Sequence, residues 1–331
     1  MTERVTIGTD PELIFTDQND KLLNASNYLD KEGKFGLDGH AWIAELRPDH
    51  AVYPRDLVES IRKTLGLQAE KLRDLIWLSG PWLKNKPMGG HLHFGIPFED
   101  NYMQALDNQL GFLLALSEPE EGARTRRTQK FQGSHDDFPY GVLGNIRVKP
   151  AYGFEYRTPG SFLASPGIAL ATITVAKAII MEEAEKASMA WSRLPLAMKT
   201  DLVVNKDDFN NANKIVFKNK LDSYWKMLKA MRYFQKGMEG HELWSSVAYL
   251  KSKVFPTDGF QIGHDIKTKW GFKAVNPLKI PKKKEPTPIL LEPKFWGKEF
   301  RLIETKFTQF APLPSAIPAQ LWWEIIERIQ M

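Results

Sequence analysis

The sequence contains no cysteine and no long apolar run. The absence of cysteine from all 331 residues excludes disulfides, thiolate metal sites and a cysteine nucleophile, and it fits a reducing compartment. No apolar stretch approaches the roughly 20 residues that a membrane-spanning helix needs. The N-terminal segment MTERVTIGTD also lacks the apolar core of a signal peptide. We therefore expect a cytoplasmic protein with no membrane partner.

Two glycine-rich patterns that bind phosphate are also absent. The chain has no G-x-x-x-x-G-K-S/T, and no G-x-G-x-x-G opens a predicted helix. Any nucleotide must therefore be held by metal ions and arginines rather than by a helix N-terminus. The net charge of +5 is unevenly spread, because residues 251–306 hold 13 Lys/Arg against 6 Asp/Glu. This segment is either a solvated basic surface or a contact for nucleic acid or another polyanion.

Short strands joined by turns alternate with helices, which predicts an α+β fold with an antiparallel or mixed sheet. We expect strands at 5–15 (one strand, or two with a break at Pro11), 22–26, 41–47, 91–96, 145–149 and 153–157. Helices are expected after Tyr53, at 101–116 and from Pro166 to about 187, the last capped by Ser165. Residues 118–140 are polar and are predicted to form a loop.

Patterns of charged and histidine residues typical of an active site are not found after residue 195. Helices are expected at 208–234 and 241–252, a proline-rich loop at 276–293 that includes Lys279–Lys284, and a short helix at Leu321–Ile329. We predict that residues 1–195 form the catalytic sheet and its helices, and that residues 196–331 complete the same domain.

Four pairs of charged or histidine residues, each with one residue between its members, lie in or next to predicted strands. They are Asp10/Glu12, Glu45/Arg47, His91/His93 and Glu155/Arg157. Residues two apart in a strand point to one face about 7 Å apart, so each pair can face one cavity. Alone, the acidic pair could be a solvated turn and each acid–arginine pair a cross-strand ion pair. The histidine pair after Gly89-Gly90 is more specific, because buried imidazoles need partners.

The four pairs together suggest phosphoryl transfer from ATP. Carboxylates and imidazoles bind divalent metals, and arginines neutralise polyphosphate. Around these pairs the chain resembles the phage-type carboxylate–amine ligases (amidoligase type 2) of the glutamine-synthetase and glutamate–cysteine-ligase superfamily. The matching segments are GTDPELIF, GLDGHAWIAELRP, GGHLHFGIP and LGNIRVKPAYGFEYRTPGSFLASP, which cover residues 8 to about 166.

The resemblance implies a curved antiparallel sheet that forms an active-site funnel with packed helices. It implies ATP and Mg²⁺ as cofactors, with Mn²⁺ as a substitute, and an amide bond formed through an acyl phosphate. By position, the implied metal ligands are Asp10, Glu12, Glu45, His91 and Glu155. The implied nucleotide contacts are His93, Arg157 and Arg124, and the implied catalytic cations are Arg147, Arg157 and Arg127. If a phage encodes the chain, its compartment is the host cytoplasm.

Two other functions remain open from the residues. One is another ATP-dependent phosphotransferase on the same fold, such as a small-molecule kinase. The other is a nucleic-acid-associated accessory protein that uses the basic segment 267–284. A scaffold that has lost its chemistry is disfavoured, because all four pairs are present. For the ligase, the partners are small-molecule or peptide carboxylates and amines.

Overall fold

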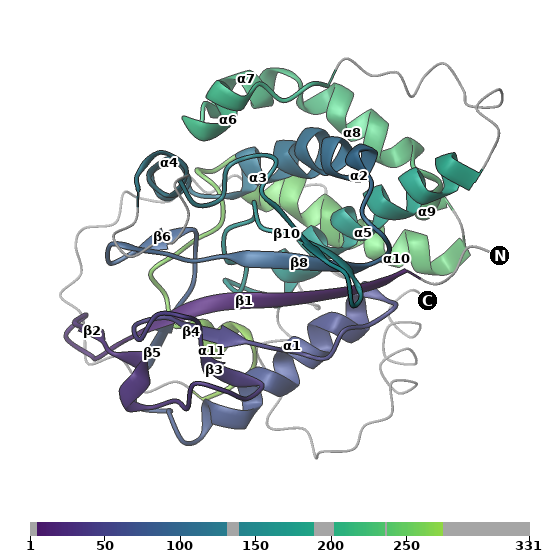
Figure 1. Cartoon of the computed structure of the whole chain (residues 1–331). Coiled ribbons are helices and arrows are strands. Elements are labelled where there is room, and N and C mark those ends of the chain that lie inside the picture. The colour runs from purple at the N-terminus through teal and green to yellow at the C-terminus, as the bar shows by residue number, and fades with distance from the viewer. Residues whose placement is uncertain (1–4, 131–138, 189–201, 236, 274–331) are drawn as a thin grey trace, which may run out of the picture.

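The computed structural model describes residues 5–130, 139–188, 202–235 and 237–273. Its centre is an eight-stranded antiparallel sheet in the order β3–β4–β1–β8–β10–β9, with β2 and β5 also paired to β1 (Figure 1). The strands are β1 (Thr6–Thr16), β2 (Leu22–Leu23), β3 (Phe35–Leu37), β4 (Ala44–Leu46), β5 (Ile76–Leu78), β8 (Gly90–Gly95), β9 (Ile146–Lys149) and β10 (Gly153–Tyr156). A small hairpin pairs β6 (Trp82–Leu83) with β7 (Lys86–Pro87). The predicted α+β architecture with an antiparallel sheet is confirmed.

Strand β1 continues through Pro11 as a single strand. Residues 6–11 pair with β8 on one edge, and Glu12 and Leu13 pair with β4 on the other. The Glu12 N–H donates to Gly89 O on the β8 side (2.9 Å). Successive backbone N–H groups of a strand point to opposite edges, so the Pro11 nitrogen faces the edge where pairing with β4 begins only at Glu12. The proline therefore removes no ladder hydrogen bond.

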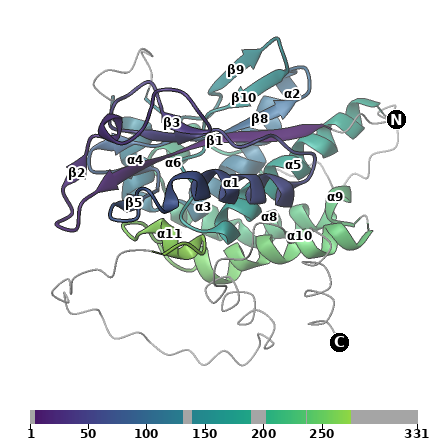
Figure 2. The ribbon, with the colours of Figure 1, turned by 90° about the horizontal axis from the view of Figure 1, so that it is seen from below.

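One face of the sheet is apolar and packs against helices. Ile7, Leu13, Phe94 and Phe154 are fully buried in one hydrophobic cluster with side chains of α1 (Pro54–Ala69) and α5 (Pro166–Ser188). Burial of each such side chain contributes about 1.5–3 kcal/mol. Figure 2 shows the strands along one side of the molecule, with α1, α5 and then α10 beneath them. The helices thus leave the opposite face of the sheet for polar side chains.

Several predicted elements are confirmed. Helix α1 begins at Pro54, and the Ile168 N–H donates to Ser165 Oγ (3.3 Å) at the start of α5. The helix expected at 101–116 is α2 (Asp100–Ala105), a π-helical turn (Leu106–Leu110) and α3 (Gly111–Ser117). Strands β9 and β10 form the expected hairpin. The strand predicted at 22–26 is shorter, because η1 (Ala25–Asn27) follows β2.

The predicted loop at 118–140 is wrong over its first part, because residues Glu120–Thr128 form helix α4. Pro119 precedes the helix, where its missing N–H costs nothing. Acidic Glu120 and Glu121 lie in the first turn, and basic Arg126 and Arg127 lie in the last. This order of charges matches the helix dipole and stabilises the helix. The polar composition that suggested a loop belongs to a helix whose charges follow its dipole and two of whose arginines, Arg126 and Arg127, are buried.

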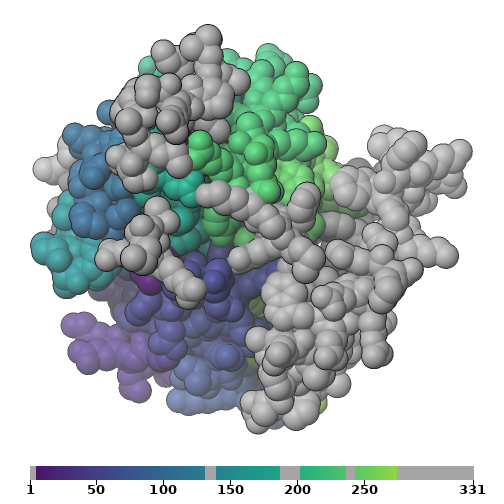
Figure 3. Space-filling view, turned by 90° about the vertical axis from the view of Figure 1, so that its right-hand side faces the viewer, coloured from purple at the N-terminus to yellow at the C-terminus, as the bar shows by residue number. Residues whose placement is uncertain are grey.

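Residues 202–273 form seven described helices and the turns between them. These are α6 (Lys206–Asn210), α7 (Lys214–Asn219), α8 (Leu221–Ala230), α9 (Arg232–Gln235), α10 (Gly237–Tyr249), a π-helical turn (Leu250–Val254) and α11 (Ile266–Lys269). The helix expected at 208–234 is therefore four short ones. Leu228, Val247 and Trp270 belong to the same hydrophobic cluster as Ile7. On the face seen in Figure 3, the green surface of these helices adjoins the purple and blue N-terminal part.

Part of the sequence-based prediction lies outside the described residues. This applies to the proline-rich loop at 276–293 with Lys279–Lys284, and to the helix at Leu321–Ile329. Within the described ranges, no helix has the length and apolar character needed to span a bilayer.

Candidate active site

The pairing of the strands places the predicted polar residues on the face of the sheet opposite to the helices. Glu12 pairs with Glu45 across β1 and β4, and Asp10 pairs with His91 across β1 and β8. Across β8 and β10, His93 pairs with Glu155. Directly paired residues share a face of the sheet, so these side chains form one continuous polar surface.

The first group of candidate metal ligands consists of Asp10, His91 and Glu155. His91 Nδ1 lies 3.1 Å from Asp10 Oδ1 and 3.4 Å from Glu155 Oε1. One ligand atom from each residue lies within 4.8 Å of the others. His91 and Glu155 are buried, and Asp10 is partly buried. Burial alone would raise the pKa of Asp10, but the His91 and His93 imidazoles hold it well below its ordinary value.

The oxygen atoms of the first group fit a divalent cation. Asp10 Oδ1 and Glu155 Oε1 are buried, with His91 Nδ1 3.1 Å from the first and Arg157 Nε 3.2 Å from the second, but neither contact has hydrogen-bond geometry. Buried carboxylate oxygens without a hydrogen bond can take a metal ion as a further partner. Ligands on opposite sides of Mg²⁺ lie about 4 Å apart, so small side-chain movements would close this group around an ion. Two carboxylates and one imidazole suit Mg²⁺ or Mn²⁺.

The second group consists of Glu12, Asp38 and Glu45, whose ligand atoms also lie within 4.8 Å of one another. Burial, and then the charge of Asp38, raises the pKa of Glu12 well above its usual range. Burial and the charge of Asp10 raise the pKa of Glu45 to about 8, although Arg47 Nε lies 2.7 Å from its Oε1 and lowers it. Crowded carboxylates of this kind would be stabilised in their ionised form by a divalent cation.

Asp38 was not among the residues predicted for the site. In the β3–β4 hairpin Gly36 pairs with Glu45, so Asp38, two residues beyond Gly36, lies on the same face. The alternation Gly36-x-Asp38 beside a strand that carries Glu45 was the signal that could have found it. The turn-like sequence around Gly39 concealed this alternation.

Tyr140 is the second residue that the sequence did not indicate. Its hydroxyl donates to Glu12 Oε1 (3.2 Å) and also makes a short hydrogen bond with His91 Nε2. The Gly89 N–H donates to the other Glu12 oxygen, Oε2 (2.7 Å). A Cβ atom at Gly89 would lie 2.3 Å from His91 Nε2 and 2.7 Å from the Tyr140 hydroxyl. Only glycine therefore lets these groups approach so closely.

Three cations surround Glu155. Arg157 Nε lies 3.2 Å from Glu155 Oε1, while Arg147 and Lys149 lie 3.3 Å and 3.5 Å from Oε2. The cross-strand ion pair that the sequence left open is thus present between Arg147 and Glu155. The Arg147 side chain is still 49% exposed, so part of its guanidinium can reach an anion above the sheet. Lys149 was not predicted.

His93 extends the polar face beside the first group. Its Nε2 lies 3.1 Å from Asp10 Oδ2, and the Tyr152 hydroxyl bonds its Nδ1 at 2.9 Å. The Tyr152 and His93 rings are stacked, with their planes 9° apart. His93 therefore lies at the edge of the ligand group, and the nucleotide contact expected of it from the sequence stays a prediction.

The structure does not bring Arg124 or Arg127 to this face, contrary to the expectation from the sequence. Arg127 is buried in α4, where it pairs with Glu118 and donates to Phe209 O (2.7 Å). Arg124 is exposed, pairs with Glu120 and donates to Asn211 O (3.2 Å). Of the three arginines, Arg126 lies nearest to the site, with its guanidinium 4.6 Å from the centre of the Tyr140 ring.

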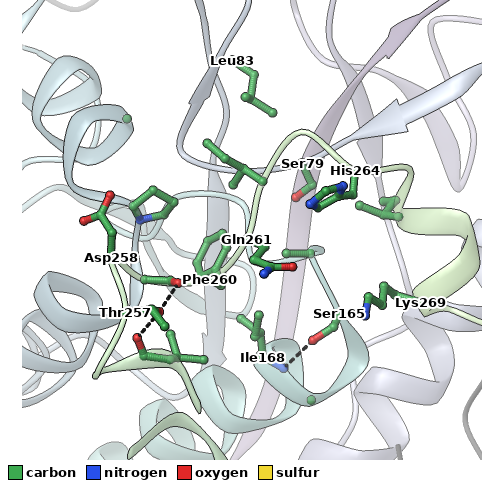
Figure 4. A pocket seen from close by; sticks show the side chains of 18 of the residues that line it. Ser79, Leu83, Ser165, Ile168, Thr257, Asp258, Phe260, Gln261, His264 and Lys269 are labelled. Carbon is green, nitrogen blue, oxygen red and sulfur yellow. Dashed lines mark hydrogen bonds between the residues drawn. The ribbon is translucent and has the colours of Figure 1, made fainter. Parts of the chain in front are cut away.

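A cavity of about 1110 Å³ lies elsewhere in the molecule, bordered by the start of α5, the end of α10 and residues 257–266. Figure 4 shows Ser79, Ser165, Gln261, His264 and Lys269 among the side chains that line it. Of the described residues that line it, none is a candidate metal ligand. We place the chemistry on the charged face because the ligand atoms and cations converge there.

The fold and the site define a mixed α/β protein whose antiparallel sheet carries two groups of candidate metal ligands beside arginines. Residues 7–272 match the family described as "Phage phiEco32-like COOH.NH2 ligase-type 2", and the chain belongs to this family. The resemblance inferred from the four motifs is thereby confirmed. The family is one of carboxylate–amine ligases. No curated protein matches the sequence.

Two solved structures show a weaker likeness. A bifunctional glutathione synthetase from Pasteurella multocida is 11% identical, with a TM-score of 0.44 over 80% of this chain and 49% of that chain. A novel glutamine synthase homologue is 14% identical, with a TM-score of 0.32 over 75% of this chain and 70% of that chain. This chain thus spans about half the length of that synthetase. Because both TM-scores are low, the assignment rests on the family match.

Proposed function

We propose that this protein is an ATP- and Mg²⁺-dependent carboxylate–amine ligase that forms an amide bond through an acyl phosphate. The observation that carries the proposal is the polar face of the sheet. It holds two groups of ligand atoms, Asp10/His91/Glu155 and Glu12/Asp38/Glu45, next to Arg147 and Arg157. Family membership supports the same reaction class.

In this proposal the two groups hold two divalent cations. Mg²⁺ prefers oxygen ligands, and Mn²⁺ accepts the same set with an imidazole, so Mn²⁺ should substitute. Bound there, the cations supply charge neutralisation to the phosphates of ATP. The protein contributes a fixed spacing, because Asp10 and Glu12 project from one strand and each partner residue projects from the neighbouring strand.

The cations of the polar face would orient and stabilise the transferred phosphoryl group. A carboxylate is a poor acyl donor, because its leaving group would be oxide. Transfer of the γ-phosphoryl group to the carboxylate gives an acyl phosphate and ADP, and attack by an amine then releases phosphate and one proton. Arg147 and Arg157 lie where guanidinium groups can bind phosphoryl oxygens. His93, next to Asp10, is our candidate for the nucleotide side.

The same proposal includes the finer shape of the site. We infer that the sheet is a curved catalytic sheet of the glutamine-synthetase type, with the polar face as the wall of a funnel. The substrates would be a small-molecule or peptide carboxylate and an amine. Nucleic acid would be a partner only if one substrate were attached to it.

A mass-spectrometric screen tests the proposal. The protein is incubated with ATP, Mg²⁺ and mixtures of carboxylates and amines, and products are scored for the summed mass less one water together with ADP. Glu155→Gln provides the inactive control, and Glu59→Gln, at an exposed position of α1, provides the matched active control. A phosphorylated product that persists when amine is present would instead identify a phosphotransferase. Salt-sensitive binding of nucleic acid without product would favour the accessory protein.

A further inference from the structure

Tyr140 connects the two ligand groups through a single hydroxyl. It follows α4 in the chain, outside the strands that carry the ligands. The hydroxyl bonds His91 Nε2, in the first group, and Glu12 Oε1, in the second. The sheet pairs Glu12 and His91 with other residues, so this contact is additional to the strand pairing.

One hydroxyl can hold both neighbours at once. A phenol donates one hydrogen bond and can accept others, so Tyr140 can bond Glu12 Oε1 and His91 Nε2 together. The other imidazole nitrogen of His91, Nδ1, faces the first group, 3.1 Å from Asp10 Oδ1 and 3.4 Å from Glu155 Oε1.

The arrangement suits metal binding at Nδ1. A histidine that binds a metal through one nitrogen is usually hydrogen-bonded through the other, and this bond fixes the orientation of the ring. Here the partner is not an isolated group, because the Tyr140 hydroxyl also bonds Glu12, a ligand of the second group. Each group thus orients a member of the other.

The surroundings hold Tyr140 in this position. The guanidinium carbons of Arg126 and Arg157 lie 4.6 Å and 5.5 Å from the centre of its ring, within the range of cation–π attraction. Arg126 is itself fixed by bonds to the carbonyls of Thr158 (2.7 Å) and Pro159 (2.9 Å). The ring is also perpendicular to that of His91, with the centroids 5.6 Å apart.

We propose that Tyr140 is a positioning residue that orients the His91 ring and couples the two metal groups through the hydrogen bonds of its hydroxyl to His91 Nε2 and Glu12 Oε1. The inference rests on the proposed metal sites of the ligase. It assigns Tyr140 no contact with the reacting atoms. Loss of the hydroxyl should weaken metal binding at both groups, because both lose an orienting hydrogen bond.

The test compares wild-type protein with Tyr140→Phe, which keeps the ring and its contacts with the arginines. Tyr224→Phe is the matched control, since the Tyr224 hydroxyl is also buried and donates to Gln109 O (2.9 Å), in the helical part of the protein. Mn²⁺ alone is titrated by calorimetry and electron paramagnetic resonance. Circular dichroism and thermal melting establish folding.

We expect Tyr140→Phe to raise the Kd of Mn²⁺ about 10- to 100-fold, in the range for groups that orient metal ligands. We also expect it to change the electron paramagnetic resonance spectrum of bound Mn²⁺, while Tyr224→Phe changes neither the Kd nor the spectrum. An unchanged Mn²⁺ affinity and spectrum in folded Tyr140→Phe would overturn the inference and leave the ligase proposal standing. The expected changes in a protein that forms no amide would retain the inference and overturn the ligase.

Discussion

The two ligand groups lie on one sheet face but balance their negative charge differently. In the first group Asp10 lies against His91 and His93, which lower its pKa below the ordinary value, and the cations of Arg147, Lys149 and Arg157 contact Glu155. In the second group, burial and crowded carboxylates raise the pKa of Glu45 to about 8 despite the contact with Arg47. Asp10 is therefore ionised without a metal, whereas Glu12 and Glu45 of the second group need a cation to hold them ionised.

The largest effect should come from Glu155→Gln, which removes a charged member of the first group. Turnover should fall about 10³-fold, because charge stabilisation worth several kcal/mol would be lost. Amide formation from the substrates found in the screen measures the loss, with Glu59→Gln as control. Wild-type turnover in Glu155→Gln would show that this group is not a metal site.

Arg157→Ala should lower kcat about 10²-fold while thermal stability changes little, since electrostatic stabilisers of a transferring group typically contribute this much. Arg124→Ala, at an exposed position that contacts Glu120, should leave kcat within about twofold. The test measures initial rates and melting temperatures of both variants and compares them with those of the wild type. If Arg157→Ala loses stability in proportion to activity, the arginine has a structural role and no separate role in catalysis.

Asp38→Asn probes the second group and should raise its Kd for Mn²⁺ about 10-fold, because one negative ligand becomes neutral. The affinity of the first group should change less, since Asp38 does not belong to it. Calorimetric titration of the metal-free protein resolves the two steps. Equal weakening of both steps would mean that the groups bind as one unit.

The smallest effect is on the pH dependence of stability. Because Glu45 titrates at about 8 in the fold and at 4.5 in the unfolded chain, the folded state binds more protons between these values. The free energy of unfolding of the metal-free protein should therefore fall as pH rises from about 4.5 to about 8. Asp10 contributes no slope there, because it is ionised in both states.

Urea unfolding in a chelator over this pH range measures the slope. Glu45→Gln should make it shallower, and saturating Mg²⁺ should make it shallower in the wild type, because the ion favours the ionised carboxylates. A stability that rises with pH over this window in metal-free protein would contradict the assignment of the second group.

The part of the site that follows from strand periodicity could be predicted from the sequence. Asp10, Glu12, Glu45, His91 and Glu155 share a face because their strands pair without a bulge between them. The position of Asp38 on this face depends on the register of the β3–β4 hairpin. The glycine-rich sequence of this turn does not predict that register. Tyr140 reaches the site through tertiary packing of a connection, and no local pattern encodes this contact.

The three arginines at 124, 126 and 127 show how an error in the predicted secondary structure misplaces side chains. In a loop, Arg124, Arg126 and Arg127 could all face one phosphate. In helix α4 successive side chains are turned by about 100°, so the three point in different directions. One contacts Glu120 at the surface, one approaches Tyr140 and one is buried with Glu118. Acidic residues at the start of this segment were the signal for a helix.

Because Asp10 and Glu12 lie on one uninterrupted strand, the two groups cannot tolerate an insertion or deletion between them. A change of one residue at Pro11 would turn one of the two carboxylates toward the buried face that holds Ile7 and Leu13. Even a change of two residues would shift every pairing beyond it along β8 or β4. Length variation in this protein should therefore be confined to the connections between strands, with the spacing within β1 held constant.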